Sequence, residues 1–213
     1  LLLALLSLQV YLSFDPAFAG DAPEAGGPRR WRRWGLALLL FALSLTSKTV
    51  SASLPAALLL LLWWRHGALP RRQVLPLLPF FAVGLALGAV TVWVEKTHVG
   101  ATGADWDLGP ATRVLIAGRA VWWYARTLVW PFDLCFNYPR WEIDPSAPWQ
   151  WLFPLAAVGL VAGLVAARRR LGRGPLVAAL IDGGVLLPAL GFIDVYPFRY
   201  TWVMDHFQHH AYA

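Results

Sequence analysis

Apolar runs of nearly membrane-spanning length dominate this sequence. Hydrophobic residues make up 58% of its 213 residues, more than the roughly 45–50% of soluble domains. They are gathered into runs close to the ~20 residues that cross a bilayer. In a bilayer every backbone polar group needs a partner within the protein, and helices meet that need segment by segment. We therefore predict an all-α, polytopic membrane helix bundle, with its apolar helices in the regions 1–14, 34–64, 74–94, 151–167 and 175–193.

Arginine clusters between these runs indicate which loops face the cytoplasm. Residues 15–33 are rich in Gly, Pro and Ala and end in four arginines, and a second cluster occupies 168–173. Cytoplasmic loops carry an excess of Lys and Arg. We therefore expect 15–33 to be a cytoplasmic loop and the net charge of +6 to reflect membrane topology, with no nucleic-acid partner. A single cysteine, Cys135, excludes an internal disulfide and a Cys-rich metal site.

The run 34–64 is too long for one simple span. As one helix it would measure roughly 46 Å, against a hydrocarbon core of ~30 Å. Its middle is polar around Lys48, and Pro55 interrupts helical hydrogen bonding nearby. Both flanks are basic, which requires an even number of crossings. We predict two short helices, about 34–46 and 51–64, that meet near Lys48 at the outer face. The alternative is one long tilted helix whose lysine reaches up to the interface.

The segment 112–130 mixes arginines with Trp and Tyr, and two placements are open for it. Arg119 and Arg126 are seven residues apart and share one helix face, whereas Arg113 is less well aligned. If the segment crossed the membrane, the cluster at 168–173 would lie outside. The distribution of positive charge therefore favours a short helix lying in the outer interface or dipping in and returning, within an outer loop of residues 95–148. A crossing helix is the alternative.

Polar and aromatic residues alternate in 194–212, directly after the last apolar run. Asp194 and Asp205 are the carboxylates best placed to contact sugar or acceptor, because aromatic residues such as Tyr196 that can stack on sugar surround them. His206 precedes His209 and His210 by three and four residues, a spacing that suits a metal on a helix. Hydrogen-bonding histidines at the interface are the commoner explanation of such a group.

Cationic groups predicted near the outer face could hold a lipid-linked phosphate. Arginine recognises phosphate through two parallel hydrogen bonds. Each such residue could instead anchor its helix to lipid headgroups. No phosphate-binding glycine loop, zinc-protease motif or nucleophile elbow is present. The candidate donor-phosphate residues are Lys48, Arg119, Arg126, Arg140 and Arg199.

Three stretches in this order resemble one family of enzymes. They are SKTVSASLPAALLLLLWW (47–64), WWYARTLVWPFDLCFNYPRW (122–141) and LPALGFIDVYPFRYTWVMDHFQHHAY (187–212). They are similar to the TMTC-like protein O-mannosyltransferases of bacteria, which belong to the GT-C class of membrane glycosyltransferases and carry C-terminal tetratricopeptide repeats. The resemblance covers most of the chain from about residue 34.

The resemblance implies a polyprenyl-phosphate sugar donor, such as a mannose donor, and transfer to a protein or glycan hydroxyl at the outer, periplasmic face of a bacterial inner membrane. It places Lys48 at the broken helix pair and Arg140, Asp194, Arg199, Asp205 and His206 near the donor–acceptor cavity. The resemblance implies no particular cofactor, and it leaves open whether a divalent metal is bound.

Residues 1–213 are expected to be part of a GT-C-like domain. The chain opens inside an apolar run, so the N-terminal spans and the C-terminal repeats are expected to lie outside it. The catalytic acidic residue of the first outer loop is expected before Leu1. Two other functions stay open: a transporter or flippase of lipid-linked intermediates, which would use the broken helix for passage, and a non-catalytic membrane scaffold for a repeat domain.

Overall fold

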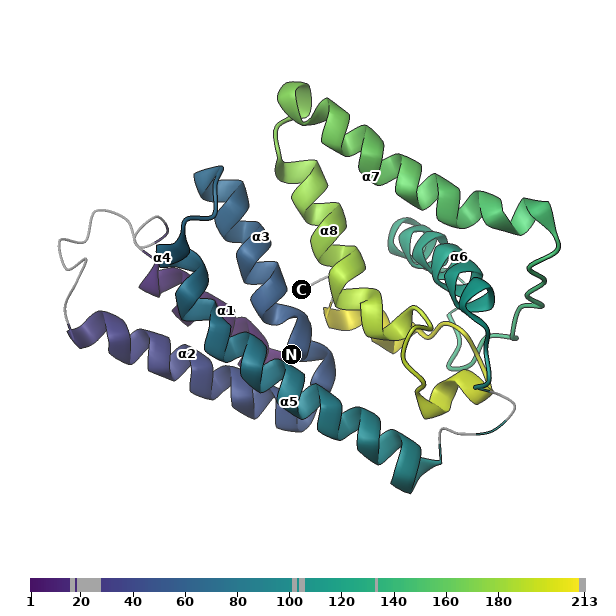
Figure 1. Ribbon diagram of the computed structural model, residues 1–213, viewed down its shortest axis with the longest axis horizontal. Coiled ribbons are helices and arrows are strands. Elements are labelled where there is room, and N and C mark those ends of the chain that lie inside the picture. The colour runs from purple at the N-terminus through teal and green to yellow at the C-terminus, as the bar shows by residue number, and fades with distance from the viewer. Residues whose placement is uncertain (16–17, 19–27, 101–102, 104–105, 133, 211–213) are drawn as a thin grey trace. The chain divides into compact units, whose positions relative to one another are not determined.

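The computed structural model describes residues 1–15, 18, 28–100, 103, 106–132 and 134–210, except for the side chains of 28, 29 and 208–210. Within these residues every regular element is helical and no strand occurs, as predicted (Figure 1). The chain divides into two compact units, Leu1–Val90 and Thr91–Tyr212.

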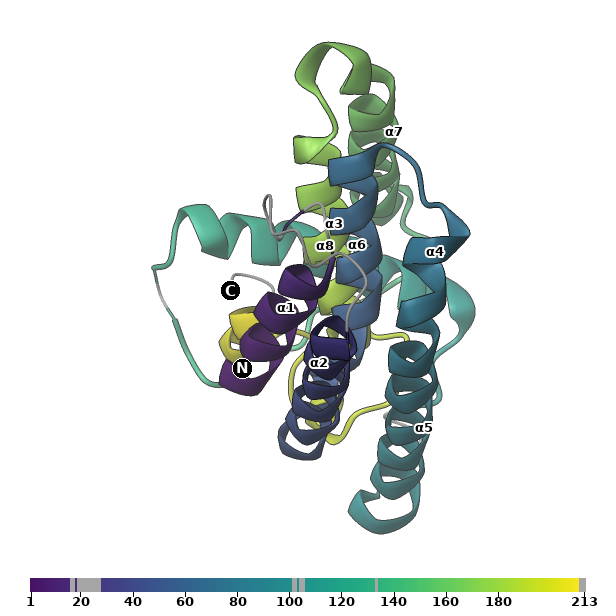
Figure 2. The ribbon, with the colours of Figure 1, turned by 90° about the vertical axis from the view of Figure 1, so that its left-hand side faces the viewer.

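The first unit is built on an antiparallel pair of helices. In both views α1 (Leu2–Phe14) lies next to α2 (Pro28–Ser47) (Figure 1, Figure 2). The Ser7 hydroxyl donates to the carbonyl of Ala37 at 2.7 Å, and Arg33 donates to the carbonyl of Ser13 at 3.0 Å. Small side chains let these backbones approach closely. Helix α2 begins at Pro28, so the last six residues of the predicted loop 15–33 are helical.

The region 34–64 forms two helices, which confirms the predicted break. Helix α2 ends at Ser47, Lys48 takes an extended conformation (φ −155°, ψ 117°), and the short 3₁₀ helix η1 (Thr49–Ser53) leads into α3 (Leu54–His66). Pro55 stands at the start of α3, where a missing N–H costs nothing. The alternative of one continuous helix is wrong. The outer-face position of Lys48 stays a prediction.

A buried aromatic and aliphatic core joins α1, α2 and α3 to the start of the next helix. Tyr11 packs edge-on against Phe80 at 5.4 Å between ring centroids, and Phe41 lies 5.4 Å from the same ring. The indole of Trp34 donates to the carbonyl of Pro76 at 2.9 Å. The fully or nearly buried members of this core are Tyr11, Phe14, Ala37, Phe41, Leu45, Leu58, Leu62, Leu77 and Phe80.

Residues Arg71–Val99 form one continuous helical run of 29 residues. It consists of α4 (Arg71–Val74), the 3₁₀ turn η2 (Leu75–Leu77), α5 (Leu78–Val94) and the π-helical turn η3 (Glu95–Val99). The 3₁₀ turn contains Pro76, which lacks the N–H that α-helical bonding would use. The helix extends five residues beyond the predicted span 74–94, because the polar turn 95–99 remains helical until Gly100 adopts φ 85°.

The second unit contains α6 (Pro110–Val129), η4 (Pro148–Trp151), α7 (Leu152–Leu171) and α8 (Gly174–Leu186), followed by η5 (Leu187–Ala189), η6 (Tyr196–Arg199) and η7 (Asp205–His210). Helix α6 packs closely on α7 (Figure 1). The last predicted span, 175–193, is shorter than expected. Its helix ends at Ala189, because Pro188 interrupts the bonding and Gly191 turns the chain with φ 91°.

Two helices of the described residues are long and apolar enough to cross a membrane, namely Arg71–Val99 and Pro148–Leu171. Helix α7 has no buried residue, and its apolar side chains, such as Leu152, Leu155 and Val158, are exposed. An apolar helix that is exposed on most sides suits a lipid environment better than water. Leu2–Phe14 and Gly174–Ala189 are shorter apolar helices. The complete polytopic bundle stays a prediction. So does the interfacial placement of α6, with a crossing helix as its alternative.

Replacing Ser7 by leucine should separate α1 from α2. Ser7 and Ala37 are both fully buried, so a larger side chain has no space there, and we expect a loss of about 1–3 kcal/mol in the free energy of unfolding. Thr46→Leu is the matched control, because Thr46 is exposed and its hydroxyl donates to a carbonyl of its own helix, whereas that of Ser7 donates to the neighbouring helix. Thermal unfolding followed by circular dichroism would test this. Equal midpoints for the two variants would contradict it.

Candidate functional site

Two motifs distant in sequence lie together in the second unit. They are Tyr138–Trp141 and Thr201–Phe207, called here the motif cluster. The indole of Trp202 donates to the carbonyl of Trp141 at 3.1 Å. The Arg140 guanidinium lies 4.1 Å from the centroid of the Trp202 ring, and its Nη1 donates to the carbonyl of Arg199 at 3.4 Å. The structure thus brings Arg140, Arg199 and Asp205 into one region of the second unit.

Asp205 is held by a tyrosine of the first motif. The Tyr138 hydroxyl lies 3.0 Å from both carboxylate oxygens of Asp205, and it accepts the backbone N–H of Cys135 at 3.0 Å. Removal from water raises the pKa of Tyr138, and its hydrogen bond to Asp205 raises that pKa further. The phenol therefore keeps its proton and donates it to Asp205. The His206 ring stacks on Phe136 at 6.0 Å between centroids.

Helix α6 supports the motif cluster from one face. The Arg119 guanidinium lies 4.5 Å from the centroid of the Trp141 ring, Trp123 packs edge-on against Tyr138 at 4.7 Å, and the Tyr124 hydroxyl accepts the N–H of Met204 at 3.3 Å. Tyr124 is fully buried. Arg126 is exposed, and within the described part of the chain no hydrogen bond or ring contact joins it to the motif cluster. Of the two aligned arginines, Arg119 therefore contacts the motif cluster and Arg126, within the described residues, does not.

Asp194 takes part in an ion-pair network. Its Oδ1 lies 2.7 Å from Nη2 of Arg113, and its Oδ2 lies 3.8 Å from the Lys96 ammonium. The same guanidinium donates to three backbone carbonyls, those of Trp106, Leu108 and Gly191, at 3.0, 3.1 and 2.9 Å. Asp194 thus fastens the chain after α8 to the start of α6. This accounts for Asp194 structurally, and its contact with sugar stays a prediction.

Tyr196 lies beside this network, at the start of η6. Its backbone N–H donates to Oε2 of Glu95 at 3.1 Å. Its ring packs against Trp106 and Tyr200, at 6.2 and 6.0 Å between centroids. The indole of Trp106 in turn donates to the carbonyl of Val195 at 3.0 Å. An accessible pair of tyrosine rings next to Arg199 suits stacking on a sugar ring.

Sequence signals for several of these residues are weak. By sequence spacing Arg113 is less well aligned than Arg119 and Arg126. The two residues have different partners, because Arg113 bonds to Asp194 while Arg119 packs on Trp141. Glu95 and Lys96 are predicted only as polar residues of the outer loop, and Tyr124 only as one of the interfacial aromatic residues of 112–130. Trp106 has no sequence signal of its own.

Lys48 lies in the first unit, in the extended link between α2 and η1. Among the side chains that the structure describes, no group of three His, Cys, Asp or Glu could hold a metal ion. The side chains of His209 and His210 lie outside the described residues, so the metal expectation at His206 stays a prediction.

The chain was also compared with known proteins. No family model, no curated protein and no solved structure matches it.

Proposed function

We propose that this protein is a membrane glycosyltransferase of the GT-C type, which moves a sugar such as mannose from a polyprenyl-phosphate donor to a protein or glycan hydroxyl. The observation that carries the proposal is the motif cluster. In this cluster Arg140 packs on Trp202 and donates to the Arg199 carbonyl, the Tyr138 hydroxyl donates to Asp205, and Trp202 donates to the carbonyl of Trp141. Such a transfer needs cations that bind the phosphate, a hydrogen-bond acceptor for hydroxyl groups and aromatic faces that stack on the sugar.

In the proposed reaction Arg140 and Arg199 stabilise the charge that develops on the departing polyprenyl phosphate. Fixed donors act well there because they need little reorganisation during the step, and Arg140 is fixed by its contacts with Trp202 and the Arg199 carbonyl. Arg119 orders the site through Trp141. The predictions that Lys48 and Arg126 contact the donor phosphate rest on the sequence alone.

Asp205 and His206 are proposed to orient the sugar or the acceptor hydroxyl, with Tyr196 stacking on the sugar. We assign removal of the acceptor proton to none of the carboxylates of this region. Asp205 already accepts a hydrogen bond from Tyr138, and Asp194 is paired with Arg113 and Lys96. The proposed location is the periplasmic face of a bacterial inner membrane, since the positive loops would face the cytoplasm.

Transfer from polyprenyl-phosphate mannose in proteoliposomes would test this proposal, with the full-length protein and three variants: Arg140→Gln, Arg199→Gln and Asp205→Asn. We expect each arginine variant to lose transfer by about 10²-fold or more, as when one donor to a developing anion is removed. Arg169→Gln, an exposed residue in the last turn of α7, is the charge-matched control. Circular dichroism would show that the variants are folded. Undiminished transfer by both Arg199→Gln and Asp205→Asn would refute the site assignment.

One observation favours a second function, the flippase of lipid-linked intermediates. The break at Lys48 produces two half-helices, and interrupted helices often line the binding sites of transporters. The same proteoliposomes separate the two functions. A flippase would move a labelled lipid-linked sugar between leaflets without releasing polyprenyl phosphate, whereas a transferase releases it in proportion to glycosylated acceptor.

A further inference from the structure

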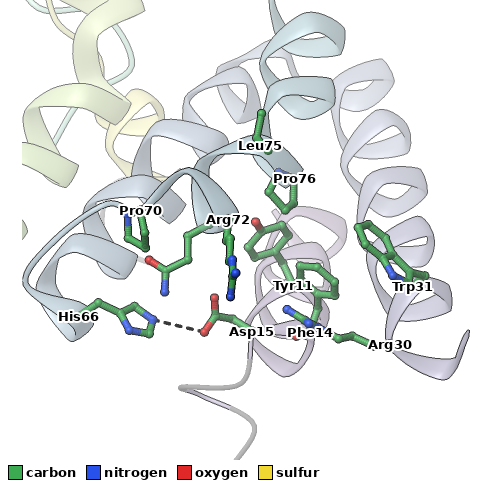
Figure 3. A pocket seen from close by; sticks show the side chains of 11 residues that line it. Tyr11, Phe14, Asp15, Arg30, Trp31, His66, Pro70, Arg72, Leu75 and Pro76 are labelled. Carbon is green, nitrogen blue, oxygen red and sulfur yellow. Dashed lines mark hydrogen bonds and ion pairs between the residues drawn. The ribbon is translucent and has the colours of Figure 1, made fainter. Parts of the chain in front are cut away.

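The first unit contains a cavity that the proposed transfer reaction does not use. It has a volume of about 550 Å³ and lies where α1 ends, α2 begins, α3 ends and α4 starts (Figure 3). All its lining residues belong to the first unit. The cavity is therefore defined without reference to the second unit and its motif cluster.

Positive charge dominates the polar wall of this cavity. Arg30, Arg72 and His66 line it together with one carboxylate, Asp15 (Figure 3). The Arg30 guanidinium is held in place, because its Nε donates to the carbonyl of Phe14 at 3.0 Å and it lies 4.5 Å from the centroid of the Phe14 ring. His66 Nε2 lies 3.3 Å from Oδ1 of Asp15. Two permanent cations facing one buried carboxylate favour an anionic ligand.

An unsatisfied polar atom indicates that the ligand also donates a hydrogen bond. Gln73 lines the cavity, and its Oε1 is buried and has no hydrogen-bond partner among the described residues. A buried acceptor without a partner costs about 1–3 kcal/mol, so a rotation of the Gln73 carboxamide that turns Oε1 to a hydroxyl or ammonium group of a ligand would be favourable. The ligand chemistry is thus an anion with a neighbouring donor.

The apolar wall suits the part of a lipid next to its headgroup. Trp31 is 55% exposed and Leu75 is 58% exposed at the cavity. Trp31 also packs against Phe14, at 5.6 Å between ring centroids. Aromatic side chains of this kind lie at headgroup level in membranes, and the basic segments beside the cavity are those predicted to face the cytoplasm.

We propose that this cavity binds a phosphate ester that carries a hydroxyl or ammonium group. In that arrangement Arg30 and Arg72 hold the phosphate, and Gln73 accepts the hydrogen bond of the donor group. Two sources offer this chemistry, a phospholipid headgroup of the inner leaflet and a small free phosphate ester, and the experiment below distinguishes them.

Isothermal titration calorimetry of the full chain, purified in phospholipid-free detergent, tests the proposal with three probes: glycerol 1-phosphate, dihexanoyl-phosphatidylglycerol and dihexanoyl-phosphatidylcholine. We expect Arg72→Gln to weaken binding of the first two probes at least tenfold. Arg71→Gln is the matched control, because Arg71 is the exposed neighbour that does not line the cavity, and it should stay within about twofold of the unmodified protein. The unmodified protein should bind phosphatidylglycerol more tightly than phosphatidylcholine, whose headgroup has no hydrogen-bond donor. Gln73→Leu should remove this preference.

The outcomes separate cleanly. Phosphatidylglycerol binding at least tenfold tighter than glycerol 1-phosphate identifies a lipid site, and equal affinities identify a site for a free phosphate ester. Binding of neither probe, or an equal loss in Arg71→Gln and Arg72→Gln, would overturn the proposal. Both arginines are exposed, so neither replacement endangers folding, and unchanged thermal midpoints would verify this.

Discussion

Arg113→Met should destabilise the second unit by about 3 kcal/mol, among the largest effects of any single replacement in this chain. The side chains of Arg113 and Asp194 are only 20% and 18% exposed. Removing one partner of a buried ion pair leaves the other charge without compensation, which costs about 3–5 kcal/mol when burial is complete. Here the Lys96 ammonium remains at 3.8 Å from Asp194, so we expect the lower end of that range. Three backbone carbonyls also lose their donor.

Thermal unfolding of the detergent-solubilised protein, followed by circular dichroism, measures this effect. Arg126→Met is the control, because it removes the same charge from an exposed position of the same helix, and it should change stability by no more than about 0.5 kcal/mol. Arg113→Lys should recover only part of the loss, since an ammonium cannot reproduce the geometry of a guanidinium. If Arg113→Met were as stable as Arg126→Met, the network around Asp194 would not fasten α6 to the chain after α8.

Gly118→Ala should also destabilise the protein, although alanine normally strengthens a helix by up to about 1 kcal/mol relative to glycine. A Cβ atom at Gly118 would lie 2.6 Å from both N and Cδ of Pro154 and 2.8 Å from its Cα. Because the obstacle is backbone and a proline ring, helix α7 itself must move away from α6. We expect a loss of about 2–3 kcal/mol, the upper part of the range for overpacked cores.

The sign of this effect makes the test specific. Gly159→Ala, in the middle of α7, meets no atom within 4 Å, so it should be neutral or slightly stabilising under the same thermal unfolding conditions. Because Trp122 donates to the carbonyl of Phe153 at 2.9 Å across the same contact, the fluorescence of that tryptophan should change in Gly118→Ala. A stabilised Gly118→Ala would show that α6 and α7 do not approach as closely as described.

Local features of the sequence predicted the helices well. The polar centre around Lys48, followed by Pro55, predicted two helices, because a proline disturbs helical hydrogen bonding within one turn of its position. The structure has the break there, with Lys48 extended and Pro55 at the start of α3. The spans 74–94 and 151–167 lie inside the two helices that are long enough to cross a membrane. Helix ends were predicted less well. Helix α2 starts at Pro28, inside the predicted loop, and the helical run from Arg71 continues to Val99, where Gly100 turns the chain.

The sequence also singled out both parts of the motif cluster, because polar residues among aromatics are rare in an apolar chain. It could not predict which of them meet. Tyr138 and Asp205 are 67 residues apart, and Arg113 and Asp194 are 81 apart. Any of the arginines of 112–130 could have paired with Asp194 by charge alone.

Composition and spacing therefore determined that this chain is helical, where its apolar segments lie and which residue types gather after them, since these follow from hydrophobicity and local hydrogen bonding. The tertiary structure alone decided that Asp194 joins an ion-pair network while Asp205 receives a tyrosine hydroxyl. It alone formed the cavity at Arg30 and Arg72. Such choices depend on which helices pack together, because burial and the distance between charges are set by contacts between segments far apart in the chain.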